Sequence, residues 1–269
     1  MSRKLAYVIS IVIIGLLTLT TVLTFNSANA KCSATLGARI DLSGCDLRGH
    51  DLSGLDLTGT DLSNSNLSGA NLRSTSLSEA NLRNANLHNA DLTRAALAGA
   101  NLQGSTLDGA TLTNADARGA NFDAAMMSEV RATGANFDGA NFSFAIIRNT
   151  DLRNGSFNGA RFSNAPMQGV TFDGAQLMRA TFEGADLSSS RFVGANATNA
   201  NFSNTVFTFS NLRGAVLSGA NLRGTNLFRT TTTGATMAGA ATNGRTTCPD
   251  GTRGPCVNSQ WTIKANAIP

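Results

Sequence analysis

The sequence predicts an all-β solenoid, a rod made by stacking short coils of the chain. Three observations lead to this prediction. Residues 40–239 form 40 consecutive five-residue repeats whose phase never slips, and we call the central position of each repeat i. Leu fills position i in 22 repeats and Phe in 10, while Ala fills i−2 in 23 and Asn or Asp fills i−1 in 22. Gly or Asn fills i+2 in 30 repeats.

The five-residue period defines a short side followed by a corner. Five matches neither the helical period of 3.6 nor the strand period of two. Positions i−2 and i are two residues apart, so a short extended segment points both side chains to the same face. Gly or Asn at i+2 supplies the left-handed backbone of a tight turn. Each repeat should therefore place i inside a polygonal coil and leave i−1 and i+1 facing water.

The pattern A-[DN]-[LF]-x-x recurs throughout this region, as in Ala80-Asn81-Leu82-Arg83-Asn84. It closely resembles the pentapeptide-repeat family, and the resemblance covers about three quarters of the chain. What it implies is a right-handed, four-sided parallel β-helix with four repeats per coil, and hence ten coils of 20 residues. At about 4.8 Å between stacked strands, the rod would be roughly 45–50 Å long.

The interior changes composition along the rod. Every i residue from Leu42 to Leu112 is Leu, and Phe enters further on. Steps of twenty residues place five Phe on one inner side in consecutive coils, where we expect a stacked aromatic ladder that serves core packing. These are Phe122, Phe142, Phe162, Phe182 and Phe202.

Residues 1–30 are typical of an export signal. Arg3 and Lys4 form a charged start, Leu5–Phe25 is apolar, and Ala28-Asn29-Ala30 fits a cleavage site before Lys31. The apolar run of 21 residues is long, so an uncleaved membrane anchor over residues 5–25 is the competing interpretation. Either interpretation places the solenoid outside the cytoplasm, in the periplasm or the extracellular space, with no membrane span left after cleavage.

The ends of the solenoid should carry caps, because an open coil end exposes its interior. We assign residues 31–39 to an amino-terminal cap and residues 240–269 to a carboxyl-terminal cap or tail. Trp261, the one Trp of the chain, is expected to cover the last coil.

The four cysteines lie in two sequence-distant groups. Cys32 and Cys45 belong to one end of the rod, and Cys248 and Cys256 to the other. A disulfide needs Cα atoms within about 7 Å, so a rod excludes pairing between the ends. The predicted disulfides are therefore Cys32–Cys45 and Cys248–Cys256, and an exported protein can retain them.

The sequence contains no recognisable catalytic motif. His50 and His88 are the two histidines, and they fall on different coils without a cluster at metal-ligand spacing. An early acidic series could suggest a calcium ring, but its carboxylates fall on different sides and should instead bond to the backbone near the corners. The series is Asp41, Asp46, Asp51 and Asp56. We therefore predict a protein without catalysis, metal or cofactor.

Charge bears on the choice between two functions. The chain is formally +4, but residues 40–239 carry 14 Arg against 16 acidic residues, or −2. The best-known members of the family that the chain resembles mimic DNA and inhibit gyrase, and a nucleic-acid-mimicking inhibitor is the alternative hypothesis. Duplex DNA carries one charge per ~1.7 Å. The nearly balanced coil and the export signal favour a structural or interaction scaffold without a nucleic-acid partner, acting on an unknown protein or envelope component.

One side of the predicted coil mixes Arg with Asp, and we interpret it as a solvated surface, with a polyanion-binding strip as the alternative. Its charged residues are Arg73, Arg131, Arg153, Arg191 and Arg213, with Asp51, Asp91, Asp151 and Asp173.

Apolar residues replace Asn or Asp on another side, where they should face water. A contiguous exposed apolar strip is a candidate partner surface. The candidate residues are Met126, Phe144, Ile146, Pro166, Val206, Phe209 and Phe228.

Overall fold

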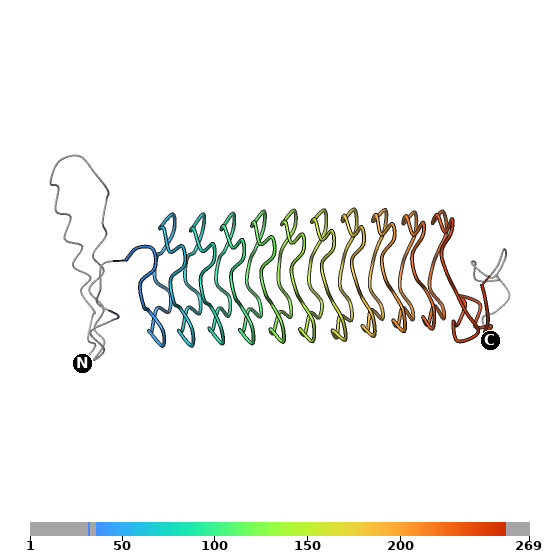
Figure 1. Ribbon diagram of the computed structural model, residues 1–269, viewed down its shortest axis with the longest axis horizontal. Helices are drawn as coiled ribbons and strands as arrows, with labels where there is room; N and C mark the ends of the chain where they lie inside the picture. Colours follow the sequence, from blue (N-terminus) through green and yellow to red (C-terminus); the bar gives the residue numbers. More distant parts are fainter. Residues whose placement is uncertain (1–31, 33–35, 257–269) are drawn as a thin grey trace, which may run out of the picture.

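The computed structural model describes residues 32 and 36–256, and these form a straight rod of stacked coils (Figure 1). Parallel bridges join i−1 residues that are 20 positions apart, from Asp41 with Asp61 to Asn221 with Ala241. One coil therefore contains four repeats, and the fold is the right-handed four-sided parallel β-helix that the sequence predicted. The described residues include no α-helix, and each side of a coil contributes a single bridging residue in place of a longer strand.

We number the four sides by their i residues in the first coil. Side 1 carries Leu42, side 2 carries Leu47, side 3 carries Leu52 and side 4 carries Leu57. The i side chains from Leu42 to Thr232 are buried on all four sides and Met237 is half-buried, so the core is the narrow interior that runs along the rod.

Backbone hydrogen bonds between neighbouring coils repeat with the pentapeptide. The Leu62 amide donates to the Asn81 carbonyl at 2.7 Å, and the Asp61 amide donates back to the Ile40 carbonyl at 2.9 Å. Within the corner, the Ser65 amide donates to the Leu62 carbonyl at 3.2 Å. Each coil thus satisfies the backbone of its neighbours, which makes stability a property of adjacent repeats.

The corners explain the Gly and Asn preference at i+2. Every i+2 residue from Gly44 to Gly239 has a positive φ, between 52° and 72°. Gly adopts this left-handed conformation without a steric penalty, and Asn tolerates it better than other residues. Phe144 and Phe209 also occupy such corners, at φ 60° and 61°, although bulky side chains rarely do.

The polar position i−1 bonds to the backbone two residues ahead. The Ser43 amide donates to Asp41 Oδ1 at 2.9 Å, and the Thr58 amide donates to Asp56 Oδ1 at 3.0 Å. This local bond is the reason that Asn and Asp are frequent at i−1. The early acidic residues thus bond near the corners, as predicted.

The interior contains the predicted ladder of five Phe. Phe142 lies between Phe122 and Phe162 with ring centroids 4.8 Å away on both sides, and the stack continues through Phe182 to Phe202. Some i−2 positions place a hydroxyl inside the rod, where it forms a hydrogen bond with the backbone. Buried Thr75, for example, donates to the Leu52 carbonyl at 2.8 Å.

The solenoid extends slightly beyond its predicted limits. Arg39 already has the corner conformation, with φ 59°, and its amide donates to the Thr58 carbonyl at 2.9 Å. At the other end, Asn226 pairs with Thr247, which is 21 positions away, so the period breaks between residues 241 and 247. The coil therefore begins one residue before the predicted boundary at 40 and keeps its register to 241.

Both predicted disulfides are present, one at each end. Cys32 and Cys45 have Cα atoms 5.6 Å apart, and those of Cys248 and Cys256 are 5.7 Å apart. The predicted signal in residues 1–30 and the predicted lid residue Trp261 lie outside the described residues. Among the residues that are described, no helix has the length and apolar character needed to cross a membrane.

Candidate interaction surfaces

The first candidate surface lies on side 2, in the outward column formed by its i−1 residues. Met126 and Ile146 are partners in one parallel bridge, so their side chains lie on adjacent coils. They are 41% and 36% exposed, in a register where Asn or Asp is usual. Phe144, at the corner just before Ile146, is 58% exposed. We call Met126, Phe144 and Ile146 the apolar strip.

Pro166 continues this column but contributes less apolar surface than predicted. It is only half-exposed. Proline has no amide hydrogen, so the bond that an i−1 residue normally donates to the preceding coil cannot form here. The Ile147 amide still donates to the Pro166 carbonyl at 2.8 Å, which keeps the coils in register.

The remaining candidates form a separate group near the carboxyl-terminal end. Asp186 stands between Pro166 and Val206 in the column, and Val206 is itself half-buried. Phe209 and Phe228 have ring centroids 6.4 Å apart, and the Arg229 guanidinium lies 5.7 Å and 5.3 Å from them. The seven predicted residues therefore divide into two places on the rod.

One exposed apolar residue was missed in the sequence. Met178 is 40% exposed on side 4, at position i+1 of its repeat. The sequence did contain a signal for it, because Met178 replaces the polar residues that are common at i+1. No neighbouring repeat shares it, and a single exposed apolar side chain is ordinary on protein surfaces.

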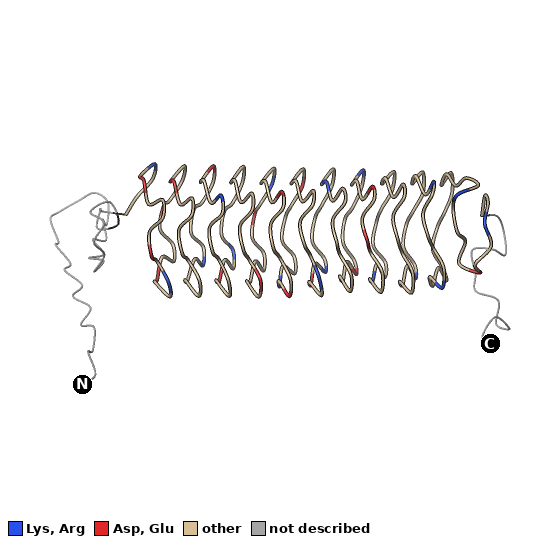
Figure 2. Cartoon of the chain, turned by 90° about the horizontal axis from the view of Figure 1, so that it is seen from below, with Lys and Arg blue, Asp and Glu red and all other residues tan. Residues whose placement is uncertain are grey.

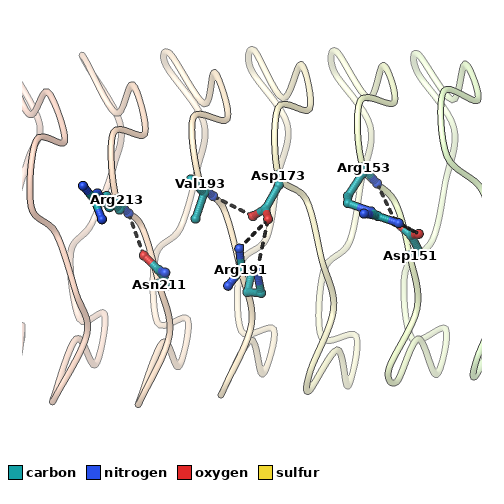
Figure 3. Close-up of polar contacts among 7 residues, drawn as sticks. All are labelled: Asp151, Arg153, Asp173, Arg191, Val193, Asn211 and Arg213. Atoms are coloured by element: carbon teal, nitrogen blue, oxygen red, sulfur yellow. Dashed lines mark hydrogen bonds and ion pairs between the residues drawn. The ribbon is translucent and has the colours of Figure 1, made fainter.

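The second candidate surface is the charged side 3, where Asp and Arg pair with one another (Figure 3). Arg153 and Asp151 pair within one repeat at 2.6 Å, whereas Arg191 reaches back one coil to Asp173 at 2.8 Å. Arg73 likewise pairs with Asp91 at 2.9 Å. A hollow in this side is lined by Asn149, Thr150, Asp151, Arg153, Thr171, Asp173 and Arg191.

The pairing determines the electrostatics of this side. Hydrogen bonds from the Arg153 side chain hold the pKa of Asp151 below its ordinary value, and they outweigh the opposing effect of partial burial. Aspartates neutralise three of the five arginines predicted on this side across 2.6–2.9 Å contacts. Arg131 and Arg213 form no ion pair with a described residue, so side 3 presents a mixed surface. The pairs favour the solvated-surface interpretation over a polyanion-binding strip.

The two histidines lie on different coils. His50 is half-buried in the first coil, and its Nδ1 lies 3.1 Å from the Arg48 carbonyl oxygen. His88 is on another coil, with Nε2 3.0 Å from the side-chain Nδ2 of Asn89. Over residues 36–256 and Cys32, no group of three His, Cys, Asp or Glu side chains could hold a metal ion.

The geometry defines a class of protein: a four-sided β-solenoid with a disulfide at each end. The pentapeptide-repeat family model matches in eight copies between residues 38 and 229. The chain therefore belongs to the pentapeptide-repeat family. The matched segments are residues 38–73, 75–114, 95–131, 107–143, 118–154, 156–192 and 190–229.

Solved structures similar to the chain are also pentapeptide-repeat proteins. HetL from the cyanobacterium Nostoc sp. strain PCC 7120, involved in heterocyst differentiation regulation, is 30% identical with a TM-score of 0.48; the match covers 80% of this chain and 92% of HetL. QnrB1, a plasmid-mediated fluoroquinolone resistance protein, is 16% identical with a TM-score of 0.42; the match covers 75% of this chain and 92% of QnrB1. No curated protein matches the chain.

Proposed function

We propose that the chain is an exported, non-catalytic scaffold that binds a protein partner through the apolar strip. One observation carries the proposal: Met126, Phe144 and Ile146 are exposed next to one another where the repeat normally has polar residues or Gly. Inner packing does not explain them, because the buried i residues fill the core of the same coils.

Backbone strain gives independent support. Phe144 holds a left-handed φ of 60° and exposes 58% of its surface, so it carries the cost of that conformation without burying its ring. Such a conformation costs about 1–2 kcal/mol for a residue with a Cβ. Strained residues that gain nothing within the fold are often found at functional sites. A partner that covers the ring would supply the missing burial.

Export is supported by the signal-like residues 1–30 and by the two disulfides, which persist in oxidising compartments. The absence of catalysis is supported by the placement of His50 and His88 on different coils and by a hollow on side 3 whose charged groups neutralise each other. The same neutralisation disfavours the alternative, a nucleic-acid mimic, because such a mimic needs a continuous negative side.

The test compares two matched Asp substitutions on side 2. Ile146→Asp places a charge in the middle of the strip, and Thr106→Asp places the same charge in the same outward column two coils earlier. An unpaired charge buried under a partner is strongly unfavourable, so Ile146→Asp should weaken binding at least 100-fold, corresponding to about 3 kcal/mol. Both variants should unfold at nearly the temperature of the unmodified protein.

The measurement is affinity capture from the cell envelope, followed by titration of the captured partner against each variant. Binding retained by Thr106→Asp and lost by Ile146→Asp supports the strip. Equal binding by both variants removes the strip as a partner surface. A large loss of stability in Ile146→Asp would show that Ile146 belongs to the core.

A further inference from the structure

The carboxyl-terminal end of the rod has a charge opposite to that of the rest. Residues 40–199 contain 11 Arg and 16 Asp or Glu, a net charge of −5. Residues 200–256 contain five Arg and one Asp, a net charge of +4, and no acidic residue follows Asp250 in the sequence. Basic residues accordingly dominate this end in Figure 2. The molecule is therefore electrically polar along its axis.

The arginines at this end also differ in their contacts. Further up the rod, five arginines form ion pairs with aspartates at 2.6–2.9 Å. The five that follow residue 200 are all exposed, and none of them forms an ion pair with any described residue. We call these five the basic end: Arg213, Arg223, Arg229, Arg245 and Arg253.

The arginines of the basic end are spread over sides 1, 2 and 3 of the rod and do not run along one side. Arg213 lies on side 3, Arg223 on side 1, and Arg229 at the corner between sides 2 and 3. Arg253 pairs with Thr247 in the segment that covers the last coil on side 2. With about 4.8 Å per coil, all five lie within roughly 15 Å of the end.

An aromatic pair accompanies these charges. The Arg229 guanidinium lies over the rings of both Phe209 and Phe228, and Phe209 remains 59% exposed. A guanidinium over aromatic faces is held in place by cation–π attraction. Phe side chains next to Lys or Arg are typical of elements that lie in the headgroup region of a membrane.

We propose that the basic end binds an anionic phospholipid surface, so that the rod stands end-on upon the membrane. Arginines spread over several sides at the end of a rod fit a plane, whereas a linear polyanion would require a basic stripe along one side. The net charge of −5 over the preceding coils would be repelled by the same surface, and this repulsion favours the upright orientation. The surface is separate from the apolar strip, which stays accessible along the rod.

The test uses the full chain, purified in the form that the cell produces, and vesicles of two compositions. One is phosphatidylcholine alone, and the other contains about 30 mol% phosphatidylglycerol, which gives it a negative surface potential. The end variant combines Arg223→Gln, Arg229→Gln and Arg245→Gln. The matched control combines Arg83→Gln, Arg94→Gln and Arg131→Gln, which removes the same charge from exposed arginines of the third and fifth coils that form no ion pair with a described residue.

The expected result is binding to the anionic vesicles that weakens with salt, because surface potentials are screened. Each basic residue near an anionic surface contributes roughly fivefold to binding, so the end variant should bind about 100-fold more weakly, and the control should change little. Any contribution from residues 5–25 is common to all three proteins and cancels in the comparison.

Three outcomes would overturn the proposal. The anionic lipid could fail to increase binding over phosphatidylcholine alone. The control could lose as much as the end variant, which would make net charge the cause. Soluble double-stranded DNA could displace the unmodified protein from the anionic vesicles completely and bind it more tightly than they do. That result would assign the basic end to a linear polyanion.

Discussion

Phe142 and Phe162 stack face to face in consecutive coils, with ring centroids 4.8 Å apart and planes 2° from parallel. The spacing matches the distance between neighbouring strands, so the ladder follows the backbone repeat. Phe162 also stacks on Phe182 at 4.7 Å and is fully buried. Removing the Phe162 ring therefore removes a stacking contact on each side of it.

Phe162→Ala should lower the free energy of unfolding by about 3–5 kcal/mol, because it leaves a cavity in a core that cannot collapse along the rod axis. Phe162→Leu should cost clearly less, since side 1 already carries Leu102 three coils earlier. Denaturant unfolding of both variants measures the difference. An Ala variant within 1 kcal/mol of the Leu variant would show that the ladder contributes little.

The exposed corner at Phe144 predicts a stabilising substitution. Phe144→Gly removes the left-handed penalty and should raise the free energy of unfolding by about 1 kcal/mol. Gly139→Ala is the matched reverse, because Gly139 has φ 69° and a Cβ there would meet nothing within 4 Å. It should cost about as much as Phe144→Gly gains. If Phe144→Gly instead destabilises the protein, the ring packs more than its exposure indicates.

The disulfides predict local loosening at each end. Cys248 and Cys256 are eight residues apart, and Cys32 and Cys45 are thirteen apart. Closing loops of these lengths contributes about 2–3 kcal/mol each in the chain-entropy model. Replacing Cys248 and Cys256 together by Ser should increase amide exchange in residues 220–256 and leave residues 40–80 unchanged. Replacing Cys32 and Cys45 together by Ser should do the reverse. Exchange that rises evenly along the rod in either variant would contradict this expectation.

The Asp151–Arg153 pair predicts a pH dependence of stability. Arg153 lowers the pKa of Asp151 in the folded protein, so the ionised form stabilises the fold. That contribution is present above the unfolded pKa of about 4 and is lost as pH falls through the lower folded value. The stability difference between the unmodified protein and Asp151→Asn should therefore be largest near neutral pH and shrink in acid. Unfolding measured from pH 7 down to pH 2.5 at roughly half-unit steps tests this, and a constant difference would rule out the linkage.

Several features followed directly from the sequence because the repeat is local and periodic. A five-residue period with a large apolar residue at i and Gly or Asn at i+2 specifies one side and one corner, and 40 copies leave few other arrangements. Four repeats per coil came from the family resemblance. Once that number is known, steps of twenty residues predict both the Phe ladder and the outward position of Ile146. The cysteine pairs followed from the rod, since its ends are too far apart to join.

Other features depended on the tertiary structure. Pro166 and Val206 share the outward register of Ile146, yet neighbouring coils half-bury them, and how far a neighbour covers a side chain depends on packing that the register does not encode. His50 occupies an inward register but stays half-exposed in the first coil, close to the end of the stack.

The sequence by itself determined the coil, its register and its two disulfides, because each repeat carries its own turn and core residue. Only the tertiary structure decided which charges neutralise each other. Arg191 pairs with Asp173 on the preceding coil, whereas Arg223 and Arg245 pair with no described carboxylate. The Arg73–Asp91 and Arg191–Asp173 pairs form between coils, over 18 residues of sequence, so they depend on the direction that each long side chain takes across the stack.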